Sequence, residues 1–254
     1  PKFPNPMTFS FLWRMGLACE CSDYRQAVLL TLRKMAFGGI YDQLAGGFHR
    51  YSVDELWAVP HFEKMLYDNA LLLKLYSEVY LSGRLAGVLS EKDEELFLRI
   101  ICETTHYVLR EMSAPQGGFY TAQDADSEGE EGKFFAWDVQ DLNSCLTPEE
   151  SKLIQRVYRV NAQGNFEHSK TVLALHDFVS ENEEELFESA RTKLFLVREN
   201  RIKPLRDEKI LTSWNALMVS GLLWAAQALD HAGKAGLAHE ARLCAKTVSY
   251  THLT

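Results

Sequence analysis

Residues 38 to 81 read GGIYDQLAGGFHRYSVDELWAVPHFEKMLYDNALLLKLYSEVYL, and two patterns meet in this stretch. From Phe62 to Leu81 the pattern is helical, with apolar residues on almost every side: Leu66, Leu72, Leu73, Leu75, Tyr76, Val79 and Tyr80. A helix that is apolar all round is buried on most of its sides. Residues 62–81 are therefore predicted to form a buried helix, and the glycine- and aromatic-rich residues before them to lead into it.

Helical periodicity also dominates the rest of the chain. It predicts further helices at 22–35, 93–112, 149–160, 183–198, 212–229 and 235–248. Thr147, Pro148 and Glu150 form a helix-start signal, in which Thr147 and Glu150 complete a capping box. Strand patterns are short and local, at 46–52, 118–122, 133–137 and 172–175. The predicted fold class is mainly α, with short β hairpins on one rim.

The predicted helices are of two kinds. Those at 62–81 and 212–229 are nearly all apolar, whereas those at 93–112 and 183–198 are amphipathic. This alternation favours inner helices packed inside outer ones, as in an α/α toroid built from helical hairpins. A weak internal repeat is consistent with such an array, because Asn69-Ala70-Leu71 resembles Asn215-Ala216-Leu217, and a Gly-Gly-Phe triplet occurs at 46–48 and 117–119.

Composition and charge exclude several classes of protein. The chain has 254 residues, 46% of them hydrophobic and 24% charged, which is a globular composition. Its net charge is −8 and it has no basic run, so we expect no nucleic-acid partner. No apolar run reaches the roughly 18 residues of a membrane-spanning helix. Residues 249–254 fit no helical period and are interpreted as a non-native tail, so the expected domain covers 1–248.

The five cysteines indicate no disulfide framework, because their number is odd and their density low. Cys19 and Cys21 are the only close pair, and their spacing is not that of a redox or zinc motif. We therefore expect reduced cysteines, which favours a cytoplasmic or mitochondrial protein. Secretion stays open, because the chain begins at Pro1 without an initiator methionine. No metal and no cofactor is predicted.

The candidate ligand pocket centres on residues 38–69. Paired glycines allow close backbone approach, and aromatic faces beside carboxylates suit a polyhydroxylated, sugar-like ligand. The ligand-binding candidates in this stretch are Tyr41, Asp42, His49, Arg50, Tyr51 and Trp57. A structural alternative is that Tyr41, Tyr51, Trp57 and Phe62 are core aromatics.

Three candidate catalytic residues, His61, Glu63 and Asp68, lie near the start of the buried helix. A carboxylate at a helix start gains from the helix dipole, which favours a base over an acid. A glycosidase needs two carboxyl groups, whereas a sugar epimerase or isomerase would use histidine, for which His49 and His61 are of the right type. The structural alternative pairs Glu63 with Lys64 or Arg50.

Two later stretches are expected to share the same rim. Residues 117–127 contain Asp124, the fourth catalytic candidate, and Asp126, a ligand-binding candidate, whereas Glu128 to Glu131 are interpreted as a solvated turn. Their spacing does not fit a calcium-binding loop. Residues 201–215 contribute three more ligand-binding candidates, Asp207, Trp214 and Asn215. The structural alternative is an exposed Asp207–Lys209 pair.

Four runs together carry a family resemblance: Lys2-Phe3-Pro4, the run from Gly38 to Leu72, GGFYTAQDADS (117–127) and DEKILTSWNALM (207–218). They resemble the spermatogenesis-associated protein 20 family, thioredoxin-domain-containing proteins whose bacterial relatives are uncharacterised. The resemblance implies a six-hairpin, glycosidase-like (α/α)6 toroid, of which this chain would be an incomplete part. It also implies a thioredoxin-like domain ahead of residue 1, against which the toroid would pack.

Two functions follow as expectations. The first is a carbohydrate-metabolism domain with a pocket for a sugar-like ligand and glycoside hydrolase or sugar epimerase/isomerase chemistry, with a role in fertility suggested by the family name. The alternative is a non-catalytic binding or redox-partner module that serves the thioredoxin-like domain. Fold resemblance does not decide between them.

Overall fold

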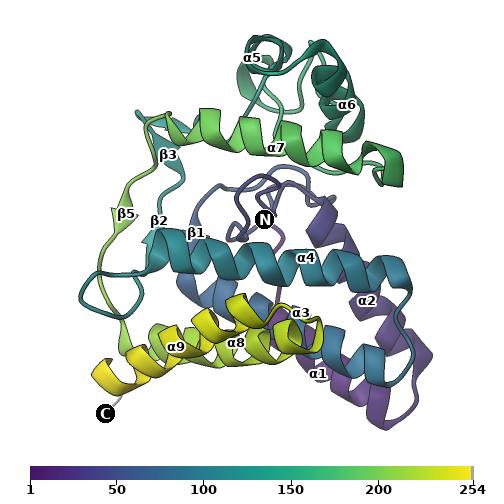
Figure 1. Ribbon diagram of the computed structural model, residues 1–254, viewed down its shortest axis with the longest axis vertical. Coiled ribbons are helices and arrows are strands. Elements are labelled where there is room, and N and C mark those ends of the chain that lie inside the picture. Colours follow the sequence, from purple (N-terminus) through teal and green to yellow (C-terminus); the bar gives the residue numbers. More distant parts are fainter. Residues whose placement is uncertain (253–254) are drawn as a thin grey trace.

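The computed structural model describes residues 1–252 and is mainly helical, as predicted (Figure 1). The helices are α1 (Pro6–Ala18), α2 (Ser22–Phe37), α3 (Leu66–Leu85), α4 (Glu91–Tyr107), α5 (Val139–Cys145), α6 (Pro148–Tyr158), α7 (Glu184–Glu199), α8 (Thr212–His231) and α9 (Ala235–His252). A π-helical turn (Val108–Met112) extends α4, and two 3₁₀ turns cover Glu167–Ser169 and Glu181–Glu183. The sequence patterns did not predict α1 and α5.

Helix α3 is the centre of the main body. It packs against α8, α4 and α1, while α2 packs on α1 and α4, and α9 packs on α8. The predicted burial of α3 is confirmed, since even polar residues on it, such as Asn69, Ser77 and Glu78, are buried. Antiparallel helices packed in this way are compatible with part of a helical toroid.

The internal repeat has a physical cause. The Asn69 amide accepts from the Phe48 N–H at 2.7 Å and donates to the carbonyls of Phe48 at 3.0 Å and Met65 at 2.9 Å. The Asn215 amide makes the same three bonds, with the Phe119 N–H at 2.7 Å and the carbonyls of Phe119 and Leu211 at 3.0 Å each. Each asparagine therefore clamps a Gly-Gly-Phe loop to the first turn of a helix. The predicted burial of 212–229 holds for one face of α8 only, because Leu217 and Leu223 are exposed on the described structure.

A small antiparallel sheet brings the three sequence runs to one rim. Its order is β1 (Lys64–Met65), β2 (Ala122–Gln123), β5 (Arg206–Asp207), with Lys64 opposite Gln123 and Ala122 opposite Asp207. Strand β1 ends directly before α3, and four residues separate the end of β5 from α8. A separate hairpin joins β3 (Asp126–Ser127) to β4 (Glu130–Glu131).

Most of the other predicted strands are reduced to isolated bridges. Tyr41 pairs with Phe48, and Trp137 pairs with Thr171, but neither 46–52 nor 133–137 forms a ladder. In the first of these segments Gly46 and Gly47 have φ of 77° and 83°, which interrupts the extended conformation. Hairpins on a rim are present, but they are shorter than the alternation of residues suggested.

Helices α5, α6 and α7 form a lobe inserted between β4 and β5, with an apolar cluster of its own (Figure 1, top). The capping box of Thr147 and Glu150 at the start of α6 is confirmed. At the other end of the chain, α9 continues to His252, beyond residue 248. Leu253 and Thr254 lie outside the described residues, and the interpretation of 249–254 as a non-native tail stays a prediction.

Candidate functional site

A polar cluster surrounds the N-terminus of α3. The Arg50 backbone N–H donates a hydrogen bond to the Glu63 carbonyl at 2.8 Å, and the Arg50 guanidinium donates to Glu63 Oε2 at 3.0 Å. Phe62, directly before Glu63, has a φ of 55°, and its ring is fully buried. Glu63 precedes β1 and lies outside the first turn of α3. The helix-dipole argument made for Glu63 is therefore wrong.

Asp68, in the first turn of α3, is the unusual member of this cluster. Its side chain is buried, with the residue 7% exposed, and Oδ2 has no hydrogen-bond partner among the described residues. Burial raises the pKa of Asp68 to about 7, and the charge of Glu63 adds to the effect. The charge of Arg50 and a hydrogen bond with Tyr67 lower the pKa of Asp68, but by less than burial raises it. Desolvation outweighs the helix dipole here.

An aromatic pair flanks the same cluster. The rings of Tyr67 and Trp214 meet nearly edge to face, with centroids 4.7 Å apart at 68°. Trp214 lies in the first turn of α8 and is half-buried. The predicted contribution of the third sequence run to this rim therefore comes through Trp214. Tyr67 was not among the predicted site residues, although it adjoins Asp68 in the sequence.

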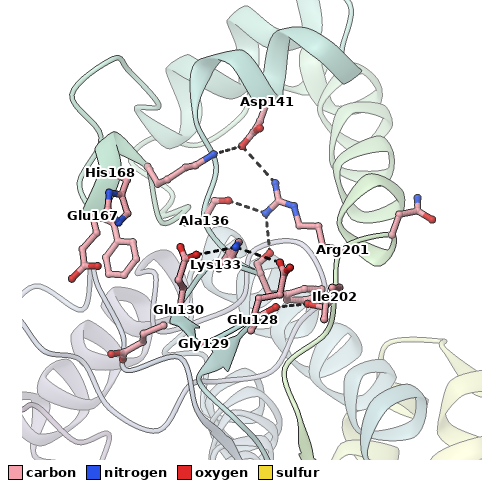
Figure 2. Close-up of a pocket in the computed structure, with 16 residues that line it drawn as sticks. Glu128, Gly129, Glu130, Lys133, Ala136, Asp141, Glu167, His168, Arg201 and Ile202 are labelled. Atoms are coloured by element: carbon pink, nitrogen blue, oxygen red, sulfur yellow. Dashed lines mark hydrogen bonds and ion pairs between the residues drawn. The ribbon is translucent and has the colours of Figure 1, made fainter.

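His61 points to another part of the rim. Its ring stacks on Tyr51 at 4.8 Å and 16°, and its Nδ1 lies 2.7 Å from Glu131 Oε1. Glu131 belongs to the β3–β4 hairpin, which forms one side of a cleft (Figure 2). Among the described residues no hydrogen bond or ion pair joins His61 to Asp68, so these two predicted catalytic residues are not linked directly.

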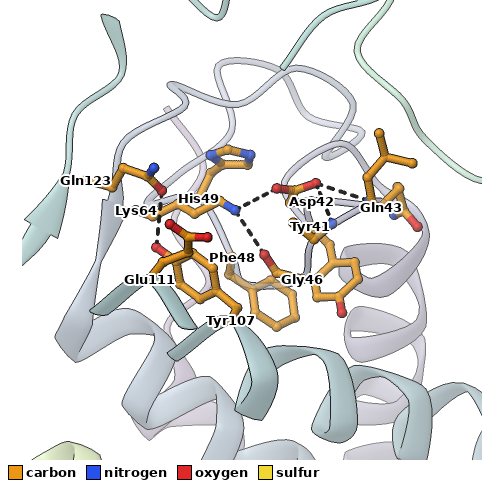
Figure 3. A network of polar contacts seen from close by, with 12 residues as sticks. Tyr41, Asp42, Gln43, Gly46, Phe48, His49, Lys64, Tyr107, Glu111 and Gln123 are labelled. Carbon is orange, nitrogen blue, oxygen red and sulfur yellow. Dashed lines mark hydrogen bonds and ion pairs between the residues drawn. The ribbon is translucent and has the colours of Figure 1, made fainter. Parts of the chain in front are cut away.

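Asp42 belongs to a buried ion network (Figure 3). Its carboxylate accepts from Lys64 Nζ at 2.8 Å and from two guanidinium nitrogens of Arg198 at 2.8 and 3.0 Å. Burial alone would raise the pKa of Asp42, but Arg198 and Lys64 hold it well below its usual range. Burial also lowers the pKa of the Lys64 ammonium to about 8, with Asp42 opposing the shift.

Tyr41 and His49 lie beside this network and are also buried. The Tyr41 hydroxyl donates to Glu103 at 2.7 Å. Burial lowers the pKa of His49 to about 3, so its neutral ring donates from Nδ1 to the Phe62 carbonyl at 2.8 Å. Together with Asp42 and Arg198, these contacts fasten the loop at 41–49 to α4, α7 and the segment before α3. Their evident role is to hold elements together.

The remaining predicted residues are either buried or paired within their own loops. Trp57 is buried, with the Lys2 ammonium 4.2 Å from its ring centroid, and Asn215 uses both amide hydrogens on backbone carbonyls. Asp124 is exposed and accepts from the adjacent Ala125 N–H at 2.7 Å. Asp126 is exposed on β3 opposite Glu131. Asp207 pairs with Lys209 at 3.0 Å, which confirms the structural alternative.

The described residues also bear on other kinds of site. No group of three or more His, Cys, Asp or Glu side chains among them is arranged to hold a metal ion. All five cysteines are free thiols. Within residues 1–252 no helix combines the length and the apolar character needed to cross a bilayer.

Comparison with known proteins identifies relatives over most of the chain. It is 36% identical to human spermatogenesis-associated protein 20 over 87% of this chain, and 34% identical to the rat protein of that name over 90%. An uncharacterised protein of Caenorhabditis elegans is 30% identical over 91%. Over the matched region, this chain belongs to the spermatogenesis-associated protein 20 family. The resemblance expected from the four motif runs is confirmed.

The chain spans about a third of the length of these relatives, since the matches cover 32%, 33% and 35% of them. No protein-family model matches the chain. The family name refers to spermatogenesis and states no reaction, so the chemistry must be argued from the site.

Proposed function

We propose that this chain is part of a carbohydrate-active α/α toroid in which Arg50, Glu63, Tyr67, Asp68 and Trp214 form one wall of a sugar pocket. The observation that carries the proposal is Asp68, a buried carboxyl group with one partnerless oxygen and a pKa raised to about 7. Buried carboxyl groups with raised pKa values cluster at catalytic sites, because a proton donor must keep its proton near neutral pH.

In this proposal the two carboxyl groups have different tasks. Asp68 is the general acid, which gives its proton to the oxygen that leaves the sugar. Glu63, paired with Arg50, is the second carboxylate, which acts as base or nucleophile. Trp214 and Tyr67 offer ring faces and edges to the apolar side of the sugar. Epimerase or isomerase chemistry would use the same Asp68 proton without breaking a glycosidic bond.

The rest of the pocket and the domain partners belong to the proposal as well. Trp13, Leu17, Leu81, Leu85 and Trp224 line a groove of about 750 Å³ on α1, α3 and α8. Further helices of the same protein would cover this groove and complete the (α/α)6 toroid, and the thioredoxin-like domain would pack beside it. The threefold greater length of the relatives leaves room for both. A role in fertility would concern the animal members.

The test uses the full-length protein that contains this chain. Nitrophenyl glycosides report hydrolysis, and proton exchange at C2 of N-acetylglucosamine in D₂O reports epimerisation. We expect turnover in the wild type. It should fall at least a hundredfold in Asp68→Asn and less than twofold in the exposed control Asp207→Asn. Undiminished turnover in Asp68→Asn would overturn the assignment of Asp68.

A second candidate function is the non-catalytic binding or redox-partner module. It is favoured by the acids of the two later runs, because Asp124, Asp126 and Asp207 are exposed, and Asp124 and Asp207 accept hydrogen bonds or ion pairs within their own loops. In that case a sugar would quench the fluorescence of Trp214 without turnover, or would have no effect at all. Wild type and Asp68→Asn would then behave alike in both turnover assays.

A further inference from the structure

We propose that the cleft between the β3–β4 hairpin and the inserted lobe is a second binding site, which takes ligands through an alkylammonium group. The cleft has a volume of about 750 Å³, within the range of ~300–1,000 Å³ that small-molecule sites occupy. It shares none of its lining residues with the Asp68 cluster. The proposal is therefore independent of the sugar chemistry.

Figure 2 shows three segments that enclose the cleft. The hairpin from Ser127 to Lys133 forms one side, the loop from Phe166 to Lys170 forms another, and the residues after α7, Arg201 and Ile202, close the third. The hairpin and the lobe are tied together at its edge, because the Arg201 guanidinium donates to the carbonyls of Phe134 and Ala136 at 2.9 and 2.8 Å. The walls are thus held in place without a ligand.

The charges inside the cleft favour a cation. Five carboxylates line it, against His168 and three lysine or arginine side chains: Glu128, Glu130, Glu131, Asp141 and Glu167 against Lys133, Lys170 and Arg201. Each lysine and arginine already has a carboxylate partner: Lys133 has Glu130 at 2.9 Å, and both Lys170 and Arg201 lie beside Asp141, at 2.9 and 3.6 Å. An anionic ligand would have to displace these pairs.

Two carboxylates of the lining have no lysine or arginine partner among the described residues. Glu131 is paired only with His61, from outside the lining, and Glu167 forms no ion pair with any described residue. The hairpin also shows that an ammonium fits there, because the Lys133 nitrogen sits 2.9 Å from Glu130 and 3.4 Å from Glu128. A second ammonium would be stabilised by the remaining carboxylates.

Apolar groups in the lining suit the chain that carries such an ammonium. The buried Phe134 and Ala136 and the half-buried Phe166 belong to the lining of the cleft. Aromatic faces attract cations within ~6 Å, and methylene groups pack on apolar surface while their charged end stays near carboxylates. An unbranched alkylammonium, as in a polyamine or a lysine side chain, has this combination.

Calorimetry on the full-length protein tests the proposal with three probes. They are spermidine, Nα-acetyl-lysine methylamide, and the same lysine derivative acetylated on Nε, which has lost its charge. The variant carries Glu131→Gln and Glu167→Gln, and the matched control is Glu240→Gln on the exposed side of α9. Both substitutions in the variant are at exposed positions, so the fold is expected to be unchanged.

The proposal is supported if a charged probe binds the wild type and binds the double variant at least tenfold more weakly. Its affinity for Glu240→Gln should be within twofold of wild type. Binding should also weaken with added salt, since the carboxylates are exposed. Spermidine alone would point to a free polyamine, and the lysine derivative to a basic side chain of a polypeptide. The proposal is overturned if neither charged probe binds, if the neutral derivative binds equally well, or if the double variant matches the wild type.

Discussion

Asp42 and Asp68 lie on the same 27-residue stretch of chain and are almost equally buried, at 5% and 7% exposure, yet their carboxyl groups are in opposite states. Asp42 has two cationic partners and a pKa well below its usual range. Asp68 has an oxygen without a partner and a pKa raised to about 7. Burial is the same in the two cases, so the partners decide whether a buried acid holds the fold together or keeps a proton.

Removing the charge of Asp42 should have the largest effect on stability. Asp42→Asn leaves Lys64 and Arg198 buried without a counter-charge, and breaking one partner from such a pair costs about 3–5 kcal/mol. Chemical denaturation of the full-length protein should show this loss at pH 7. Asp126→Asn, at an exposed position, is the control. A loss below 1 kcal/mol would show that the network adds little.

Replacing Asp68 with asparagine should instead increase stability. The raised pKa of Asp68 means that its ionised form is disfavoured in the fold, so the contribution of Asp68 to stability falls as pH rises from about 4 through about 7. Asp68→Asn avoids this loss and should be more stable by about 2–4 kcal/mol above pH 7. Below pH 4 the two proteins should be alike. Destabilisation of Asp68→Asn at pH 8 would mean that the carboxylate is needed structurally.

Acid should also affect the stability of the Asp42 and Asp68 variants differently. Because the pKa of Asp42 is lower in the folded protein than in the unfolded chain, its carboxylate stabilises the fold above its unfolded pKa. This stability is lost as pH falls through the pKa of the folded protein. In Asp68→Asn the unfolding midpoint should therefore lack the fall that Asp68 causes between pH 4 and 7. It should decline below about pH 6.5, where the unfolded His49 takes up a proton that the buried ring does not, and should fall further in strong acid as Asp42 is protonated. In Asp42→Asn much of that acid-induced fall should be absent. Equal acid sensitivity in both variants would contradict the assignment.

Glu63→Gln should have a smaller effect on stability, which acts mainly through the pKa of Asp68. The charge of Glu63 raises the pKa of Asp68 and also occupies Arg50. Without it the pKa of Asp68 should move down, towards its ordinary value, with less than about 1 kcal/mol change in stability, because the Arg50–Glu63 pair is partly exposed. The pH dependence of the unfolding midpoint measures the shift. An upward shift would mean that Glu63 is not the neighbouring charge.

The sequence predicted the helices better than the site because helical burial repeats every few residues, whereas the site depends on distant parts of the chain. The apolar pattern predicted α3, and the paired Asn and Gly-Gly-Phe runs predicted a repeat that Asn69 and Asn215 explain. Arg198, in contrast, reaches Asp42 across 156 residues. No local pattern distinguishes an acid that meets such a partner from one, like Asp68, that does not.

The most direct test of the central claim is the protonation of Asp68 itself. The carboxyl ¹³C resonance of Asp68, assigned by its absence in Asp68→Asn, can be followed from pH 3 to 9 in the full-length protein. A midpoint near pH 7 is predicted, with the Asp42 resonance unchanged over the same range. A midpoint at or below pH 4 would contradict the assignment of Asp68 as the proton donor.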